Sequence, residues 1–282
     1  MEFLINEKFE LKKEYLKHFL REYWFAPQDV LLRSVETSII RACNFVHPIL
    51  DIGIGDGGVS RFIFPPGIKI DVGIDIEEGG LQKAKKTGVY KKVLQADAMN
   101  LLFNDSSFNS VVSNSTFEHV ADDKKAVKEV GRVLKKNGYF FLTVPSINLP
   151  RTILSIEGKN GKTNAKQALE KFNKRVVHRH YRLLSSWNKI LKKNSLKIVF
   201  YKYYYPDQTT RPWYRLMKIY TFKIKNRELW SYLAHSKFRK LIPEKLVIYF
   251  LGKYVLDKPY SDGLTASDSN GSMLFIVSKK FS

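Results

Sequence analysis

The residues best suited to hold a ligand lie in one glycine-rich run, Asp51-Ile52-Gly53-Ile54-Gly55-Asp56-Gly57-Gly58. The run continues a short apolar segment that begins at Pro48 and is typical of a buried parallel strand. Glycines at such a turn let the backbone approach a ligand closely, and the helix that follows presents its N–H groups to that ligand. Proteins that bind nicotinamide or flavin dinucleotides carry similar turns. The run therefore predicts a nucleotide-like ligand without specifying which one.

The carboxylate of Asp75 is the second candidate for ligand binding. It lies 20 residues after Gly55, near the end of the apolar segment 68–76 that should form the next strand. A carboxylate in this place can accept hydrogen bonds from both hydroxyls of an adenosine ribose. An acid in a surface loop is the simpler interpretation of Asp75 alone, but its spacing from the glycines favours a ligand site.

Further motifs surround these two candidates in a fixed order. They are VGIDI at 72–76, QADAMNLLF at 95–103, SNSTFEHV at 113–120 and EVGRVLKKNG at 129–138. With the glycine-rich run, this series resembles the class I S-adenosylmethionine-dependent methyltransferases. Within that family it is most similar to the large subgroup with quinone-modifying and surface-polysaccharide-modifying members. A dinucleotide-binding enzyme has no reason to carry Asp97-Ala98 or Glu118-His119 in these places.

The resemblance implies that S-adenosyl-L-methionine is the cofactor and assigns a role to each motif. The backbone at Gly53 and Gly55 would contact the methionine part, and Asp75 would bind the ribose. Asp97 with Ala98 would read the amino edge of the adenine, and Asn114 would lie near the sulfonium. The complete set of residues assigned to the cofactor is Asp51, Gly53, Gly55, Asp75, Ile76, Asp97, Ala98 and Asn114.

Two histidines are candidates for the catalytic step. Methyl transfer from a sulfonium is an in-line displacement, so most of the work lies in positioning, and a hydroxyl acceptor also benefits from a base. Histidine suits that task because its pKa is ordinarily close to neutral pH. His119 follows the predicted fourth strand, and His180 lies in a segment expected to cover the same side of the sheet. A hydrogen-bonded structural role is the alternative for each.

The single cysteine, Cys43, offers no thiol cluster for zinc, and we assign no metal ligand.

The elements that must position these residues alternate between apolar strand segments and amphipathic helices, which predicts a doubly wound, Rossmann-like, mostly parallel α/β sheet. Residues 1–45 should form an N-terminal helical segment, with Pro27 starting a helix. Residues 46–202 and 271–282 should form the methyltransferase core. Residues 203–270 are too long for a plain loop and should form a basic, aromatic, helical insertion before the last strand.

Basic residues are concentrated in one half of the chain. The formal net charge is +21, and residues 146–282 hold 28 Lys and Arg against 8 Asp and Glu, whereas residues 1–145 hold 20 against 19. This predicts contact with an anionic lipid surface, a phosphate-bearing substrate or nucleic acid. An ordinary solvated basic surface is the alternative.

We expect a cytoplasmic enzyme at the inner face of the membrane, where an apolar helical stripe would enter the lipid interface. An alternative for this stripe is a substrate lid; its residues are Trp213, Leu216, Met217, Tyr220 and Ile224.

A second resemblance, outside the cofactor motifs, indicates which molecule accepts the methyl group. Two segments look like parts of methyltransferases from bacterial surface-polysaccharide genes. They are Trp24-Phe25-Ala26-Pro27 with Leu32-Arg33 and Glu36, and His178-Arg179-His180-Tyr181. This predicts O-methylation of a small-molecule or lipid-linked sugar in surface-polysaccharide biosynthesis. A nucleic-acid (RNA) methyltransferase or binding protein is the alternative, in which Tyr203-Tyr204-Tyr205 and Trp213 would stack bases. The sequence after the fourth predicted strand lacks the base-methylating motif Asn/Asp-Pro-Pro-Tyr, which disfavours it.

Overall fold

One seven-stranded sheet organises the molecule, with strand order β3-β2-β1-β4-β5-β9-β6. The computed structural model describes residue 5 and residues 9–235, 239, 242–267 and 269–281. The strands of the sheet are β1 Ile49–Ile52, β2 Ile70–Asp75, β3 Tyr90–Gln95, β4 Phe108–Asn114, β5 Leu134–Pro145, β6 Leu196–Tyr204 and β9 Met273–Lys280.

The sheet is mostly parallel. The ladders of β3, β2, β1, β4 and β5 are all parallel, and β9 is inserted antiparallel between β5 and β6. Every residue of β1 is buried, as expected for a central parallel strand that is covered on both faces. The predicted fold class, a doubly wound, Rossmann-like, mostly parallel α/β sheet, is confirmed.

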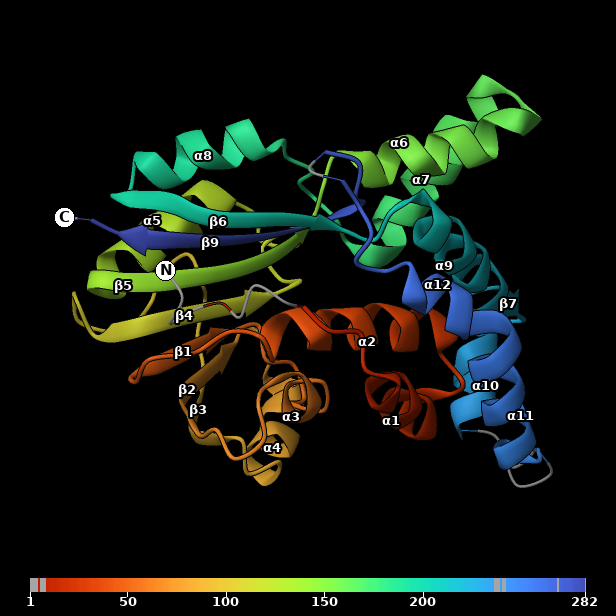
Figure 1. Ribbon diagram of the computed structural model, residues 1–282, viewed down its shortest axis with the longest axis horizontal. Helices are drawn as coiled ribbons and strands as arrows, with labels where there is room; N and C mark the ends of the chain where they lie inside the picture. The colour runs from red at the N-terminus through yellow and green to blue at the C-terminus, as the bar shows by residue number, and fades with distance from the viewer. Residues whose placement is uncertain (1–4, 6–8, 236–238, 240–241, 268, 282) are drawn as a thin grey trace.

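Helices cover both faces of the sheet and crowd one of its ends (Figure 1). Helices α5 and α8 lie on one face, and α2, α3 and α4 lie on the other. The remaining helices gather at the end of the sheet where the parallel strands terminate. The helices are α1 Lys13–Tyr23, α2 Pro27–Ile40, α3 Ser60–Ile63, α4 Glu78–Lys86, α5 Asp123–Val133, α6 Asn148–Glu157, η1 Gly158–Asn160, α7 Lys162–Val176, α8 Leu184–Lys192, α9 Asp207–Tyr220, α10 Leu229–His235, α11 Glu244–Phe250, η3 Leu251–Leu256 and α12 Asp257–Ser261.

Two helix starts follow from local chemistry, and the first is the one that the sequence analysis predicts. Pro27 is the first residue of α2, where its missing N–H costs no hydrogen bond. The Asp122 carboxylate accepts hydrogen bonds from the backbone N–H groups of Lys124 and Lys125 at the start of α5. The pair α6 and α7, which closes over the carboxyl end of the sheet, lies inside the predicted core range 46–202 and has no counterpart in the sequence analysis.

The segment 203–270 contains helices α9 to α12, η3 and the short hairpin of β7 (Lys223–Ile224) with β8 (Arg227–Glu228). The apolar stripe of α9 packs inward against α2 and α6. Trp213, Leu216 and Met217 are all less than a tenth exposed, so the prediction that they enter a lipid interface is wrong. Parts of the predicted ranges 1–45 and 203–270 lie outside the described residues.

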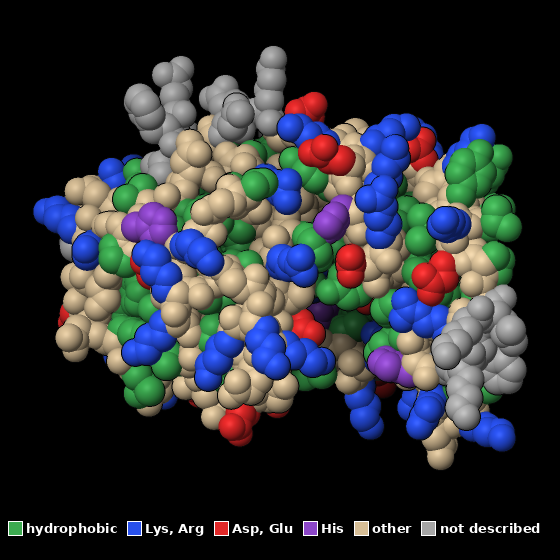
Figure 2. Space-filling view, turned by 90° about the horizontal axis from the view of Figure 1, so that it is seen from below, with side chains coloured by type: hydrophobic (Ala, Val, Ile, Leu, Met, Phe, Trp, Pro, Cys, Tyr) green, Lys and Arg blue, Asp and Glu red, His purple; other side chains and the backbone are tan. Residues whose placement is uncertain are grey.

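Three findings bear on the predicted membrane and nucleic-acid partners. Lys and Arg side chains are scattered across the face seen from below, and at the side where α11 lies in Figure 1 they adjoin exposed hydrophobic side chains (Figure 2). Within the described part of the chain, no helix has the length and apolar character needed to cross a bilayer. Tyr204 and Tyr205 are buried, so they cannot stack nucleic-acid bases as the alternative function requires.

Candidate active site

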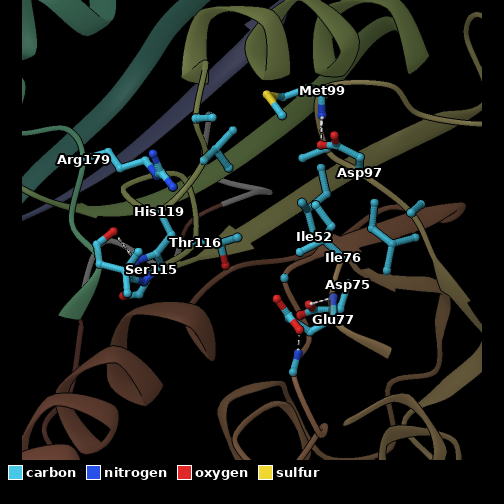
Figure 3. Close-up of a pocket in the computed structure, with 18 of the residues that line it drawn as sticks. Ile52, Asp75, Ile76, Glu77, Asp97, Met99, Ser115, Thr116, His119 and Arg179 are labelled. Carbon is cyan, nitrogen blue, oxygen red and sulfur yellow. Dashed lines mark hydrogen bonds between the residues drawn. The ribbon is translucent and has the colours of Figure 1, made fainter. Parts of the chain in front are cut away.

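A cavity of about 560 Å³ opens at the carboxyl ends of β1, β2 and β4. This is the edge where ligands bind in open α/β sheets. Figure 3 shows that Asp75, Glu77 and Asp97 lie on one side of the cavity, whereas Ser115, His119 and Arg179 lie across from them. We call these two sides the nucleoside end and the acceptor end.

The glycine-rich run lines the cavity with backbone. Gly53 and Gly55 both have positive φ, 85° and 54°, which side-chain-bearing residues adopt at a cost. A Cβ on Gly53 would come within 2.1 Å of the Thr116 hydroxyl oxygen, so only glycine fits there without displacing the opposite wall. A Cβ on Gly80 would lie 2.7 Å from the Gly55 carbonyl oxygen. Gly80, near the start of α4, therefore lets this helix approach the glycine-rich turn closely.

Asp75 is held in place by backbone hydrogen bonds. One carboxylate oxygen accepts from the Gly55 N–H at 2.7 Å, and the other accepts from the Glu77 N–H at 2.9 Å. A carboxylate has about four acceptor sites, so two remain for the hydroxyls of a ribose. The bond to Gly55 also ties the second strand to the glycine turn. Asp75 and the turn therefore form one preorganised unit.

Asp97 is oriented in the same manner. Its carboxylate accepts a hydrogen bond from the Met99 N–H at 2.8 Å and lines the cavity together with Ala98. Ile76 also lines the cavity and is 58% exposed, which leaves an apolar surface for a flat ring. The glycine cradle, the two fixed carboxylates and the apolar wall together fit S-adenosylmethionine. The predicted cofactor residues Gly53, Gly55, Asp75, Ile76, Asp97 and Ala98 all lie on this cavity.

Two predicted cofactor residues lie away from the cavity wall. Asp51 is 3% exposed and accepts a hydrogen bond from the Tyr90 hydroxyl at 2.7 Å. Burial raises the pKa of Asp51 to about 7. Asn114 donates to Glu36 at 3.0 Å and accepts from the Thr143 hydroxyl at 2.8 Å. Both side chains brace the strand ends from behind and do not line the cavity.

The acceptor end is a polar network built around a buried carboxylate of α2. Glu36 is fully buried, and it accepts hydrogen bonds from Arg33 at 2.6 Å and from the Ser115 hydroxyl at 2.6 Å. The second sequence resemblance includes both Arg33 and Glu36 but assigns neither of them a role.

The two predicted catalytic histidines differ in position. His119 lines the cavity and its side chain is 40% exposed, so it can reach a bound acceptor. His180 does not line the cavity, and its Nε2 lies 2.9 Å from the carbonyl oxygen of Val120. That bond joins the segment after α7 to the segment after β4, which makes His180 a structural histidine. Burial, with Arg33 nearby, lowers the pKa of His119, so its ring is neutral and can accept a proton.

Two neighbours of His119 were not selected from the sequence. Glu118 is 3% exposed, and burial raises the pKa of its carboxyl to about 8. His178 packs with its ring centroid 5.2 Å from that of His119, and burial lowers its pKa to about 3. The resemblance placed Glu118 in a motif. Only the fold shows that the turn after α7 places His178 beside His119.

The comparisons with known proteins agree with this geometry. A family model described as a methyltransferase domain matches residues 50–142. The uncharacterized methyltransferase YcgJ of Bacillus subtilis is 34% identical over 105 residues, which are 36% of this chain and 41% of that protein. The demethylmenaquinone methyltransferase of Thermotoga maritima is 30% identical over 135 residues, which are 48% of this chain and 55% of the relative. The chain thus spans about half the length of these curated relatives.

A solved structure extends the likeness in fold to nearly the whole chain. An S-adenosylmethionine-dependent methyltransferase from Thermotoga maritima superposes with a TM-score of 0.53 at 18% identity, covering 95% of this chain and 98% of that one. The chain therefore carries a class I S-adenosylmethionine-dependent methyltransferase domain. S-adenosyl-L-methionine is the cofactor of this domain, and the cavity described above is where its residues would hold it.

Proposed function

We propose that the protein is an O-methyltransferase that acts on a hydroxyl of a small-molecule or lipid-linked sugar acceptor. The observation that carries this proposal is the continuity of the cavity from the cofactor carboxylates to the polar acceptor end at Ser115 and His119. When bound, the cofactor supplies a methyl group whose carbon bonds to the acceptor oxygen while the C–S bond breaks onto sulfur and the hydroxyl proton leaves to a base. The neutral ring of His119 is placed to take that proton.

The polar network of α2 supports a hydroxyl-bearing acceptor. Ser115 lines the cavity, and its hydroxyl donates to the buried Glu36, which also accepts from Arg33, so this polar part of the wall is fixed from behind. Arg179, at the rim, adds an exposed positive charge that suits a phosphate or pyrophosphate on the acceptor. These groups favour a polar acceptor with an anionic handle, such as a sugar linked to lipid through phosphate.

Product identification tests this function. The purified protein would be incubated with methyl-labelled S-adenosylmethionine and separated polar, lipid, nucleic-acid and protein fractions of cells. We expect label in a polar or lipid fraction, in a product heavier by one methylene unit that withstands mild alkali as an ether does. Label confined to nucleic acid, or a product methylated on nitrogen or on an acid-labile or alkali-labile ester, would contradict the proposal.

We also propose that the protein associates with an anionic membrane through α11 and η3 instead of α9. Four aromatic or apolar side chains of this region are more than half exposed, namely Leu246, Tyr249, Phe250 and Tyr254. The groove between α1 and this region, about 660 Å³ in volume, has a basic rim that includes Lys17, Lys245 and Lys253. Apolar side chains flanked by basic ones are typical of surfaces that lie in a lipid interface.

Liposome sedimentation tests the membrane proposal. Each basic residue near an anionic surface contributes about 1 kcal/mol, so Lys17→Glu with Lys253→Glu should weaken binding roughly tenfold or more. Replacing Tyr249, Phe250 and Tyr254 by serine should have a similar effect. The matched control is Leu102→Ser with Phe281→Ser, which removes exposed apolar side chains elsewhere and should leave binding unchanged. Equal binding by all variants, or none by the wild type at low salt, would refute this surface.

A further inference from the structure

Three side chains that commonly ligate metals converge beside the acceptor end: Glu118, His119 and His178. One ligand atom of each lies within 4.8 Å of the others. The His119 Nε2 is 4.0 Å from a carboxylate oxygen of Glu118. The other carboxylate oxygen, Oε2, is buried and has no hydrogen-bond partner among the described residues. A buried polar atom without a partner costs free energy, so this carboxylate is set up for a ligand.

Hydrogen bonds to Nδ1 leave a lone pair on Nε2 of both histidines. His119 Nδ1 lies 3.2 Å from the carbonyl oxygen of Val177, an acceptor only, so the ring donates its Nδ1–H there. The Tyr181 hydroxyl donates to the Asn173 side-chain oxygen at 2.6 Å. It therefore accepts from His178 Nδ1, which lies 2.9 Å away. Metal-ligating histidines are typically held in this way, with the other ring nitrogen donating to a carbonyl or a polar side chain.

The backbone that carries His178 is strained. Val177 has φ 56° and ψ 31°, a left-handed conformation that is rare for a β-branched residue and costs about 1–3 kcal/mol. The Arg179 N–H also donates to the Glu118 carbonyl oxygen at 2.8 Å, which ties this turn to the segment after β4. Such strain is characteristic of turns that hold side chains at functional sites.

A cation bound here would have to displace a proton from Glu118. Burial raises the pKa of this carboxyl to about 8, so it is largely protonated at neutral pH, and a carboxyl binds a metal ion only after losing its proton. The guanidinium of Arg33 is already paired with the buried Glu36. Arg179, the one lysine or arginine among the described residues that line the cavity, is exposed and can turn toward solvent.

We propose that Glu118, His119 and His178 form a two-histidine, one-carboxylate site for a divalent transition-metal ion, with Zn²⁺ as the first candidate. Two imidazoles and a carboxylate form a common catalytic zinc ligand set, in which a fourth position stays open. Tetrahedral zinc needs ligand atoms about 3.3 Å apart. Small side-chain rotations that move each ligand atom by about 1 Å would bring the three atoms to that spacing. The open position would face the cavity that His119 lines. With the ion bound, His119 would be a ligand instead of the base, and the ion would lower the pKa of the acceptor hydroxyl so that its proton leaves to water. This use of the ion rests on the proposed function, whereas ion binding does not.

Metal titration without cofactor or acceptor tests this site. The full-length protein would be stripped with a chelator and titrated with Zn²⁺ by calorimetry and with Co²⁺ by visible absorption. We expect one tightly bound ion per chain and the intense absorption of four- or five-coordinate cobalt. Glu118→Gln and His178→Ala should each weaken binding by about a hundredfold or more and abolish the cobalt spectrum, since each removes a ligand. His235→Ala, which removes an exposed histidine of α10 outside the cluster, is the matched control and should bind as the wild type does.

The outcomes separate the metal site from the proposed function. Substoichiometric zinc in the wild type, or unchanged affinity in Glu118→Gln and His178→Ala, would overturn the metal site, and calorimetry with S-adenosylmethionine on the same samples would show whether the cofactor site is intact. Zinc binding by a protein that ignores S-adenosylmethionine would support the metal site and contradict the methyltransferase proposal. Circular dichroism of each variant checks that lost binding does not reflect lost fold.

Discussion

At the nucleoside end of the cavity the ligand-facing groups come from three successive strand ends, within residues 51–99, and they are fixed largely by backbone hydrogen bonds. At the acceptor end they come from the segment after β4 and from the turn after α7, and they are fixed by contacts with distant segments, such as Ser115 with Glu36 of α2 and His119 with the Val177 carbonyl. The first region is specified by short stretches of sequence, whereas the second exists only once distant segments have packed together. The difference predicts that the nucleoside end tolerates little change in backbone, and that the acceptor end depends on individual side chains.

The largest effect is expected at the acceptor end. His119→Ala should lower turnover on the order of a hundredfold or more while cofactor affinity changes less than threefold, because the ring is placed for the acceptor and its proton. Single-turnover kinetics with a saturating acceptor measures the loss. His180→Ala should lose less than threefold, because that histidine bonds to the carbonyl oxygen of Val120. If the two variants behaved in the opposite way, the assignment of roles would be reversed.

A change in backbone should have the next largest effect, at the nucleoside end. Gly53→Ala should weaken S-adenosylmethionine binding by roughly tenfold to a hundredfold, because the new Cβ meets Thr116 and the residue has positive φ. Gly79→Ala is the matched control: it lies in α4, its Cβ meets nothing within 4 Å, and alanine should stabilise the helix by about 0.5–1 kcal/mol. Binding in Gly53→Ala equal to that of the control would show that the turn does not hold the cofactor.

A smaller effect should separate residues that brace the nucleoside end from those that touch the cofactor. The pKa of Asp51 is raised to about 7 by burial, so the folded protein binds a proton that the unfolded chain releases between about pH 4 and pH 7. The stability that Asp51 contributes is therefore present at low pH and is lost as pH rises through 7. From pH 5 to pH 8 the loss should be about 2 kcal/mol.

Asp51→Asn keeps an acceptor for the Tyr90 hydroxyl and removes the titration. Urea unfolding of this variant should show a flatter dependence on pH than the wild type, and a higher stability at pH 8. Its affinity for S-adenosylmethionine should change less than threefold, because Asp51 does not line the cavity. A larger loss of affinity would restore Asp51 to the cofactor site that the sequence resemblance assigned to it.

The parts of the molecule that could be predicted from sequence are those with local causes. The order of strands and helices, the glycine turn, Asp75 and Asp97 each follow from a few adjacent residues whose spacing is set by strand and turn geometry. The stripe of α9 was misjudged because an apolar helix face looks the same whether it meets lipid or other helices. Only the packing of α9 against α2 and α6 distinguishes the two.

The acceptor end could not be predicted because no single segment contains it. Arg33 and Glu36 belong to a segment with a sequence resemblance, but their role becomes visible only when α2 is placed against Ser115. His178 and His180 differ by two positions, and nothing in the sequence says that the turn at Val177 directs only His178 toward His119. Contacts between residues 79 positions apart, such as Glu36 with Ser115, or 59 apart, such as His119 with His178, depend on the closed fold and leave no periodic pattern in the chain.

Calorimetric titration with S-adenosylmethionine tests the central claim, that this cavity is a methyltransferase cofactor site. The wild type should bind one molecule with micromolar affinity. Asp75→Ala should weaken binding by about 1.5–3 kcal/mol, or roughly tenfold to 150-fold, because a charged acceptor for the ribose is lost. Asp71→Ala, on the same strand but paired with Lys91 away from the cavity, should bind as the wild type does. Full affinity in Asp75→Ala, or no binding by the folded wild type, would contradict the claim.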